Sequence, residues 1–264
     1  MKKIQLDEDS TLAKQFHLNT KYYPGKIKKQ PFPLYNHSFQ KKQVYTNKIV
    51  DIPLLNERKD SLYQALMSRK SYTQLGIQIP ISLDVVSVLL QLTYVGRNKN
   101  TNFITTVPSA GGIYSASIYL FAFNITGIDA GIYYWNPFEK HLALLRKGNF
   151  RKEFQTGIVD INKKDVSNCT FAIVLTTDIN KICSKYEDRG YRLALLDIGY
   201  ISQNLYLVSS HLDVAIRAIG GFYDDLISAM IPNNTDDVML VHLFGKEVLS
   251  DEEQLGLNTE EYFH

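Results

Sequence analysis

The sequence contains little cysteine, no long apolar run and almost no net charge, and each absence excludes a class of protein. Its 264 residues include only Cys169 and Cys183, too few for a disulfide-stapled secreted scaffold and without the spacing of a zinc site. No apolar run approaches the roughly 20 residues that span a bilayer, and the opening MKKIQLDED lacks the apolar part of a secretory signal. We therefore expect a soluble cytoplasmic protein without a membrane partner, in which both cysteines are packing residues.

The charge is nearly balanced, with 29 Lys and Arg against 27 Asp and Glu. A formal charge of +2 gives no reason to expect a nucleic-acid partner. Basic residues are concentrated at the start, because the first fifty residues hold ten lysines against three acids. This basic arm has two interpretations, a contact with an acidic partner or peptide, or a solvated extension. The six histidines form no i, i+4 pair and no cluster with cysteine, so no metal site is predicted.

The composition divides the chain into two parts. Residues 1–55 form a basic extension whose segments YYPGK and QPFPLYNH contain turn-forming and helix-breaking residues, so we expect extended structure there rather than helices. Residues 56–264 form the predicted main domain. Helices are expected over 56–69 and over 82–96, the second with Ser82 as its N-cap.

The rest of the main domain mixes β-rich runs with one long helix. Residues 189–212 predict a helix that is apolar around most of its circumference, and such a helix must be buried in a core or at a subunit interface. The runs with strand character are SIYLFAFN, GIYYWNP, HLALLR, CTFAIVLTTD, LDVAIRAIGG and DVMLVHLFG. Because hairpins occur among helices, we predict the α+β class, a sheet with helices packed against it.

The stretch SRKSYTQLG, residues 68–76, gathers cations and hydroxyls just after a predicted helix. A phosphate needs several donors from fixed directions, and the Arg69 guanidinium with the Ser71 hydroxyl would suit it. The alternative is an ordinary loop, in which cations at a helix end interact with the negative end of the helix dipole.

The stretch PSAGGIYSASIYL, residues 108–120, has the small residues that let a backbone approach a flat ligand closely. Ser109 and exposed amides could bind the edge of a ring. The stretch is not a dinucleotide-binding fingerprint, because no strand precedes it and no acid is correctly placed downstream. A tight turn into a strand is the alternative.

The stretch KYEDRGYR, residues 185–192, places a phenol beside cations. If one helix runs through it, Lys185, Arg189 and Arg192 share a stripe with Tyr186 at its margin. Cations there would favour the phenolate and bring Tyr186 toward the strength of a general base, although the two intervening acids would oppose this. A solvated helical turn with compensated charges is the alternative.

A second glycine pair occurs in AIGGFYDD, residues 218–225. After a buried strand, Gly220 and Gly221 can present a bare N–H to a ligand. The same pair can also form a simple turn before a helix that Asp224 or Asp225 would cap.

These four stretches, in this order and spacing, resemble the nitroreductase-like flavoproteins, and in particular the SagB-type azoline dehydrogenases, over residues 56–250. FHLNTKYY near the start is similar to a His-x-x-Thr-Lys stretch in the extension of that family. The resemblance implies the α+β nitroreductase-like fold, with a mainly antiparallel central sheet flanked by helices. It also implies an FMN cofactor held at a homodimer interface.

The resemblance assigns roles to individual positions. The implied catalytic pair is Lys185 and Tyr186. The implied cofactor-binding residues are Arg69, Lys70, Ser71, Pro108, Ser109, Ala110, Gly111, Gly220, Gly221 and Lys246. Thr73 departs from the pattern, because many relatives have a second cation there, so Lys70 or Lys246 would have to help bind the phosphate.

The implied activity is FMN-dependent oxidation of thiazoline or oxazoline rings to thiazole or oxazole in a ribosomally made peptide. The implied partners are the azoline-containing precursor peptide and a cyclodehydratase complex. Two other hypotheses remain open at this stage. One is a general NAD(P)H oxidoreductase of the same fold acting on nitroaromatics or quinones, and the other is a flavin-free binding or scaffolding subunit.

Overall fold

The structure, a computed structural model, describes residues 12–25, 60–76, 79–99 and 102–247. Within these residues the helices are α1 (Leu12–Thr20), α2 (Ser61–Ser68), α3 (Leu83–Thr93), α4 (Arg151–Thr156), α5 (Lys163–Asn168), α6 (Ile179–Tyr186), α7 (Arg189–His211) and α8 (Asp224–Met230). Two short 3-10 helices are η1 (Ala110–Gly112) and η2 (Asp160–Asn162). The strands are β1 (Ile81–Ser82), β2 (Gly96–Lys99), β3 (Asn102–Thr105), β4 (Ala116–Ala122), β5 (Ile125–Thr126), β6 (Gly131–Asn136), β7 (His141–Lys147), β8 (Phe171–Thr177), β9 (Ala215–Ile219) and β10 (Asp237–Gly245).

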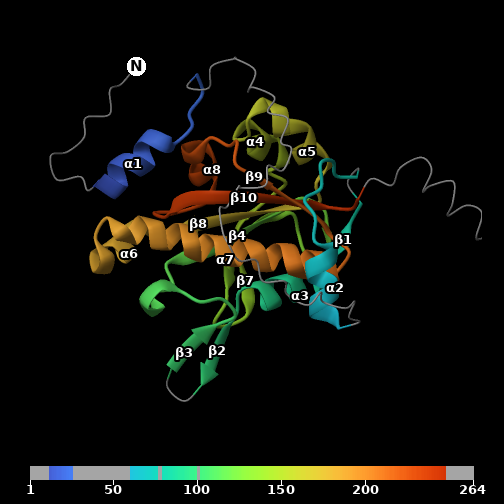
Figure 1. Cartoon of the computed structure of the whole chain (residues 1–264). Coiled ribbons are helices and arrows are strands. Elements are labelled where there is room, and N and C mark those ends of the chain that lie inside the picture. Colours follow the sequence, from blue (N-terminus) through green and yellow to red (C-terminus); the bar gives the residue numbers. More distant parts are fainter. Residues whose placement is uncertain (1–11, 26–59, 77–78, 100–101, 248–264) are drawn as a thin grey trace, which may run out of the picture.

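Six strands form the central sheet, in the order β7-β6-β4-β8-β10-β9. Every neighbouring pair in this sheet is antiparallel. All residues of β8 are buried, as expected for a central strand covered on both faces. Figure 1 shows the long α7 crossing one face of this sheet. The predicted α+β fold with a mainly antiparallel sheet is therefore confirmed.

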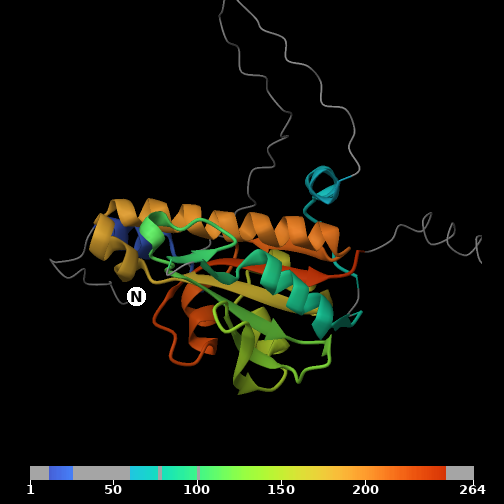
Figure 2. The ribbon, with the colours of Figure 1, turned by 90° about the horizontal axis from the view of Figure 1, so that it is seen from below.

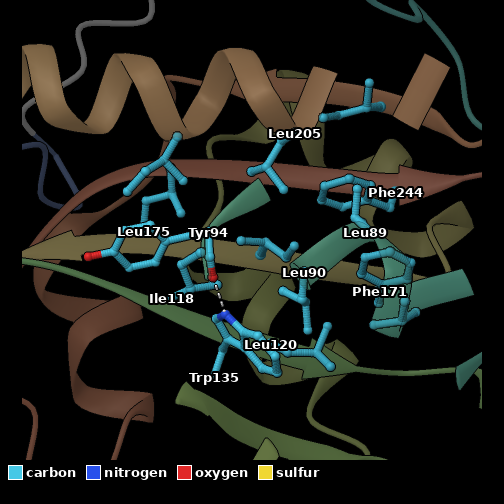
Figure 3. Packing of buried hydrophobic residues seen from close by; sticks show 14 of the residues in the cluster. Leu89, Leu90, Tyr94, Ile118, Leu120, Trp135, Phe171, Leu175, Leu205 and Phe244 are labelled. Carbon is cyan, nitrogen blue, oxygen red and sulfur yellow. Dashed lines mark hydrogen bonds between the residues drawn. The ribbon is translucent and has the colours of Figure 1, made fainter. Parts of the chain in front are cut away.

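One face of the sheet packs against α7 and α3 (Figures 1 and 2). Leu205 of α7 and Leu89 of α3 are fully buried there with Leu175 of β8. Figure 3 shows these side chains filling the space between helix and sheet. The indole N–H of Trp135 donates to the Tyr94 carbonyl at 2.7 Å, so the one tryptophan is buried without an unsatisfied donor.

The opposite face packs against α4, α5 and α8, which lie together on the other side of the sheet (Figure 2). Phe154 of α4 and Val166 of α5 are fully buried there with Ile227 of α8. The rings of Phe154 and Phe121 lie 4.8 Å apart, within the range of favourable aromatic pairs. The sheet thus separates two apolar cores, and α7 belongs to only one of them.

The chain between α6 and α7 does not continue as one helix. Glu187 has a φ of +51°, which a right-handed helix cannot contain, and α7 begins two residues later. The cationic stripe expected from a continuous helix is therefore wrong, because Lys185 belongs to α6 whereas Arg189 and Arg192 belong to α7. Elsewhere the expected helix start is confirmed, since the Ser82 side chain accepts from the Val85 N–H.

Part of the N-terminal extension is helical, contrary to the expectation of extended structure. α1 covers Leu12–Thr20 and packs beside α7 and the start of β10. The proline-containing segment QPFPLYNH lies outside the described residues, as does most of the basic arm. The helix forms before the first proline of the chain, at position 24, so no breaker interrupts it.

Two further expectations concern what the described part of the chain contains. No helix among the described residues has both the length and the apolar character needed to cross a membrane. The same residues contain no group of three or more His, Cys, Asp or Glu side chains arranged to hold a metal ion.

Candidate functional site

The glycine loop after β3 is held in place by α7. Gly111 and Gly112 have φ values of +59° and +67°, a region that glycine adopts without a Cβ penalty. The hydroxyl of Ser109 donates to the Asp197 carboxylate at 2.7 Å, and the Ala110 N–H donates to the same group at 3.2 Å. The predicted ring-binding loop is therefore a fixed turn anchored on one buried acid.

Asp197 is a site residue on this side of α7 that the sequence motifs did not point to. It is only 5% exposed, and burial raises the pKa of its carboxyl, an effect opposed by the hydrogen bonds from Ser109 and Ala110. An acid within the apolar segment LALLDIGYI was the available indication. A buried carboxylate must have partners, and the glycine loop supplies them.

Lys185 and Tyr186 meet the same loop. The Lys185 ammonium donates to the Gly111 carbonyl at 3.4 Å. A Cβ added to Gly111 would lie 2.2 Å from the Tyr186 Oη and 2.8 Å from the Lys185 Nζ. Two predicted elements more than seventy residues apart in sequence therefore converge at one glycine. We call Ser109, Ala110, Gly111, Lys185, Tyr186 and Asp197 the loop cluster.

A second group forms around the Tyr206 hydroxyl. The Ser71 hydroxyl donates to the Tyr206 oxygen at 2.9 Å, and the Ala218 N–H donates to the same oxygen at 2.9 Å. The exposed Arg69 guanidinium lies 5.7 Å from the centre of the Tyr206 ring. Because the Tyr206 oxygen accepts both bonds, its own hydrogen remains available to a further acceptor. We call Arg69, Ser71, Tyr206 and Ala218 the clamp cluster.

The glycine pair after β9 is close to the clamp cluster, but its two members differ. Gly220 follows Ala218 by two residues and is exposed, and a Cβ added to it would meet nothing within 4 Å. The Gly221 carbonyl instead accepts from the Val159 N–H at 2.9 Å. Gly220 therefore faces open space, whereas Gly221 joins β9 to the packed loop before α5. Neither Asp224 nor Asp225 caps α8, because the N-cap is Tyr223.

The remaining predicted cations are engaged within the chain. The Lys70 ammonium lies 2.5 Å from the Glu247 carboxylate, and the Lys246 ammonium donates to the Asp213 carbonyl at 3.3 Å. At Thr73, where a second cation was expected, the carbonyl accepts from Arg217 at 2.8 Å. Arg217 also forms an ion pair with the Asp165 carboxylate. Arg217 therefore holds the loop at Thr73 while its own charge is balanced by Asp165.

The two clusters lie on opposite sides of α7. Asp197 anchors the loop cluster and Tyr206 centres the clamp cluster, and nine residues separate them in one continuous helix. Nine residues make two and a half turns, so the two side chains project in opposite directions and lie about 13 Å apart along the axis. Pro108, which is exposed, precedes the loop cluster on its side of the helix. One chain therefore presents two separate clusters.

The protein has an antiparallel sheet flanked by helices. A glycine loop and a Lys-Tyr pair lie on one side of the long α7, and the clamp cluster lies on the other. These features define a nitroreductase-like α+β protein. The sequence profile of the nitroreductase family matches residues 66–246. The chain belongs to the nitroreductase family, whose members typically bind FMN and act as oxidoreductases.

Individual relatives refine this placement. A nitroreductase-family protein of Methanocaldococcus jannaschii is 25% identical over 182 residues, which cover 69% of this chain and 88% of that protein. The microcin B17-processing protein McbC of Escherichia coli is 25% identical over 144 residues, 52% of this chain. That match spans 53% of McbC, about half its length.

The fold also has a counterpart among solved structures. In the E. coli microcin synthetase McbBCD complex with truncated pro-MccB17 bound, one chain superposes with a TM-score of 0.68 at 18% identity. The superposition covers 90% of this chain and 92% of that one. The structural similarity therefore extends over nearly the whole of both chains. Because the identity is only 18%, it shows a shared fold and nothing more.

Proposed function

We propose that this protein is an FMN-dependent azoline dehydrogenase that oxidises thiazoline or oxazoline rings to thiazole or oxazole in a ribosomally made peptide. The observation that carries the proposal is the convergence of the Tyr186 hydroxyl and the Lys185 ammonium on Gly111. The similarity to McbC and to a chain of the McbBCD complex supports it.

The clamp cluster fits the phosphate end of FMN. Arg69 is exposed and forms no ion pair within the described residues, so its guanidinium is available to an anion. The free hydrogen of Tyr206 adds a hydroxyl donor, held in place by the bonds from Ser71 and Ala218. About 7 Å further along the extended chain from Ala218, Gly220 leaves room for a flat ring beside a bare N–H. When bound, FMN supplies the hydride acceptor of the reaction.

A second copy of the chain would complete the site. Because α7 lies between the two clusters, we infer that the loop cluster of one protomer meets the clamp cluster of another. The outer surface of the helices carries exposed apolar side chains that a partner would cover. These are Leu62, Leu66 and Met67 of α2, Val88 and Leu92 of α3, and Leu195, Leu196 and Tyr200 of α7. We therefore propose a homodimer with two shared sites.

Tyr186 is the proposed general base. The Cα–H of an azoline lies between a C=N bond and a carbonyl, so it is acidic enough for a positioned phenolate to remove. The neighbouring Lys185 ammonium would stabilise negative charge on the phenol oxygen and on the developing enolate-like substrate. Ser109 and Asp197 hold the loop against which both side chains are placed.

The proposed partners are a precursor peptide and the cyclodehydratase that forms its azoline rings. The McbBCD structure contains a bound truncated pro-MccB17, which supports a peptide substrate and a multi-protein assembly for this chain too. A general NAD(P)H-dependent nitroreductase is the competing function, and similarity to the M. jannaschii protein favours it.

Incubation of an azoline-bearing peptide with protein and FMN tests the proposal, read by mass spectrometry as a loss of about 2 Da per ring. Tyr186→Phe should lower the rate about 100-fold or more, because it removes the base and keeps the ring. Tyr63→Phe in α2 is the matched control and should react normally. Near-native turnover by Tyr186→Phe with FMN bound would contradict the assignment. Unchanged peptide mass with NADPH consumed by a nitroaromatic would establish the competing function.

A further inference from the structure

The part of the extension that the structure describes is docked firmly on the main domain. The His17 imidazole is buried, with its Nε2 3.1 Å from the Asp237 carboxylate and its Nδ1 3.3 Å from the Tyr191 hydroxyl. The Lys21 ammonium lies 2.9 Å from the Asp225 carboxylate. These contacts join residues more than 170 positions apart, so α1 and the residues after it belong to the folded body.

Its final residues are held at the start of α8. The Tyr22 N–H donates to the Asp224 carboxylate at 2.9 Å. The Thr20 hydroxyl donates to the carbonyl of His17 at 2.9 Å, which closes the last turn of α1. Asp224, considered above as a cap for α8, is thus used to fix the extension instead.

The docked segment lines a pocket that also includes Gly220. The pocket has a volume of about 230 Å³ and lies between the segment, α7 and the start of β10. Thr20 and Tyr22 line it together with Tyr191, Leu195, Gly220, Phe222 and Met239. Gly220 is the glycine whose N–H lies next to the proposed cofactor ring, so the pocket adjoins the place where chemistry would occur.

The lining favours an uncharged, partly polar ligand. Its exposed surface is mixed and slightly more polar than apolar, and Thr20, Tyr22 and Asp224 already form hydrogen bonds there. The Asp224 carboxylate accepts from Tyr22, and the His17 imidazole contacts Asp237 and Tyr191. An anion entering the pocket would meet the Asp224 carboxylate, and a cation would have to share that carboxylate with the Tyr22 N–H and the nearby Lys21 ammonium.

We propose that this pocket is the subsite for the ring-bearing residue of the peptide, and that residues 20–22 are specificity-determining. It takes an uncharged five-membered ring, and the docked segment supplies part of the lining. The inference rests on the proposed function, because that function places the cofactor ring at Gly220.

Two pairs of variants test it, each with a matched control next to it in sequence. Thr20→Trp fills the pocket, whereas Asn19→Trp adds the same bulk at a helix position that does not line it. Tyr22→Ala removes part of the lining, whereas Tyr23→Ala truncates an exposed neighbour that does not line the pocket. Melting temperature and bound flavin, measured for all four, identify any variant that is misfolded.

The readouts are steady-state kinetics with azoline peptide and equilibrium binding of the fluorescently labelled azole peptide, which cannot react further. We expect Thr20→Trp and Tyr22→Ala each to raise KM and the dissociation constant about 10-fold with kcat within about 2-fold. The two controls should match the unmodified protein.

The outcomes separate the two proposals. If the unmodified protein oxidises the peptide and the four variants behave alike, the pocket is not the subsite and the proposed function stands. If the unmodified protein does not oxidise the peptide, the proposed function fails and the subsite fails with it. If one folded pocket variant loses affinity while its control does not, the subsite is supported.

Discussion

The loop cluster and the clamp cluster lie on opposite sides of one helix and differ in how their polar groups are satisfied. In the loop cluster, the buried Asp197 carboxylate accepts from Ser109 and Ala110, so the loop is fixed before any ligand arrives. In the clamp cluster, Arg69 is exposed and the Tyr206 hydrogen has no assigned acceptor. Under the proposed function, one side would position catalytic groups, whereas the other would bind the anionic end of the cofactor.

Gly111→Ala should have the largest effect. A Cβ there would collide with the Tyr186 hydroxyl and the Lys185 ammonium, which must move away. Displacement of catalytic groups by about 1 Å costs on the order of 100-fold in rate, which we expect for azoline oxidation. Gly112→Ala is the control, since its φ is also positive but its Cβ would meet nothing within 4 Å. Equal losses in both variants would show that backbone strain, not the contact, is responsible.

Mixing two inactive variants tests whether the clusters work across a dimer. Arg69→Ala damages only the clamp cluster, and Tyr186→Phe damages only the loop cluster. A mixed dimer would contain one site with both defects and one site with neither. Random reassociation of subunits should therefore restore about a quarter of full activity. No recovery, with mixed dimers demonstrated by native mass spectrometry, would place the whole site within one chain.

Tyr206→Phe should weaken FMN binding while leaving the loop cluster intact. The substitution removes the phenol oxygen that accepts from the Ser71 hydroxyl and the Ala218 N–H. It therefore leaves the Ala218 N–H without its partner. We expect about a 10-fold rise in the FMN dissociation constant, equivalent to about 1.4 kcal/mol. Flavin fluorescence titration measures it. Tyr200→Phe, on the exposed side of α7, should bind FMN normally, and equal weakening there would argue against the clamp.

The two sides of α7 should also differ in how their stability responds to acid. Burial lowers the pKa of His242, whose ring lies 6.0 Å from that of Tyr206, to about 3. As pH falls, His242 is therefore protonated in the unfolded chain before it is protonated in the folded one. The folded state loses stability as pH falls from 6.5, the ordinary pKa of histidine, toward about 3. Burial raises the pKa of Asp197, so its folded form takes up a proton first and this contribution grows as pH falls through the raised value.

Urea unfolding at several pH values measures these opposing slopes. His242→Gln can keep a hydrogen bond to Ser202 but does not titrate, so it should remove a loss of up to about 1.4 kcal/mol per pH unit. Asp197→Asn should remove the opposite contribution. Unchanged pH dependence in His242→Gln would mean that this imidazole is not the acid-sensitive group.

The regular elements could be predicted because local physical rules agree with the final fold. Ser82 caps α3 as its position before an apolar helix suggested, and the six apolar runs became the strands of the central sheet. The apolar circumference of α7 is explained by one face in the core and another that is exposed. The spacing of apolar residues along a sequence indicates which face of a helix or strand is buried, so these elements could be predicted.

The arrangement of the site could not be predicted in the same way. The spacing of Lys185 and Arg189 suggested one helix, but the positive φ of Glu187 is a single-residue event that periodicity does not detect. The partners of Asp197 and Tyr206 come from residues far away in sequence, so only the fold brings them together. The side of α7 on which each predicted residue lies follows from those long-range contacts.

The contacts around β9 also protect the sheet. β9 ends the strand order, so among the described residues its outer backbone groups have no neighbouring strand and would be a template for pairing with another molecule. The Ile216 carbonyl is taken by the Tyr72 N–H, and the Ala218 N–H by the Tyr206 hydroxyl. Residues of the proposed anion site thus also cover an exposed sheet edge, and substitutions that disrupt them should make the protein more prone to aggregate.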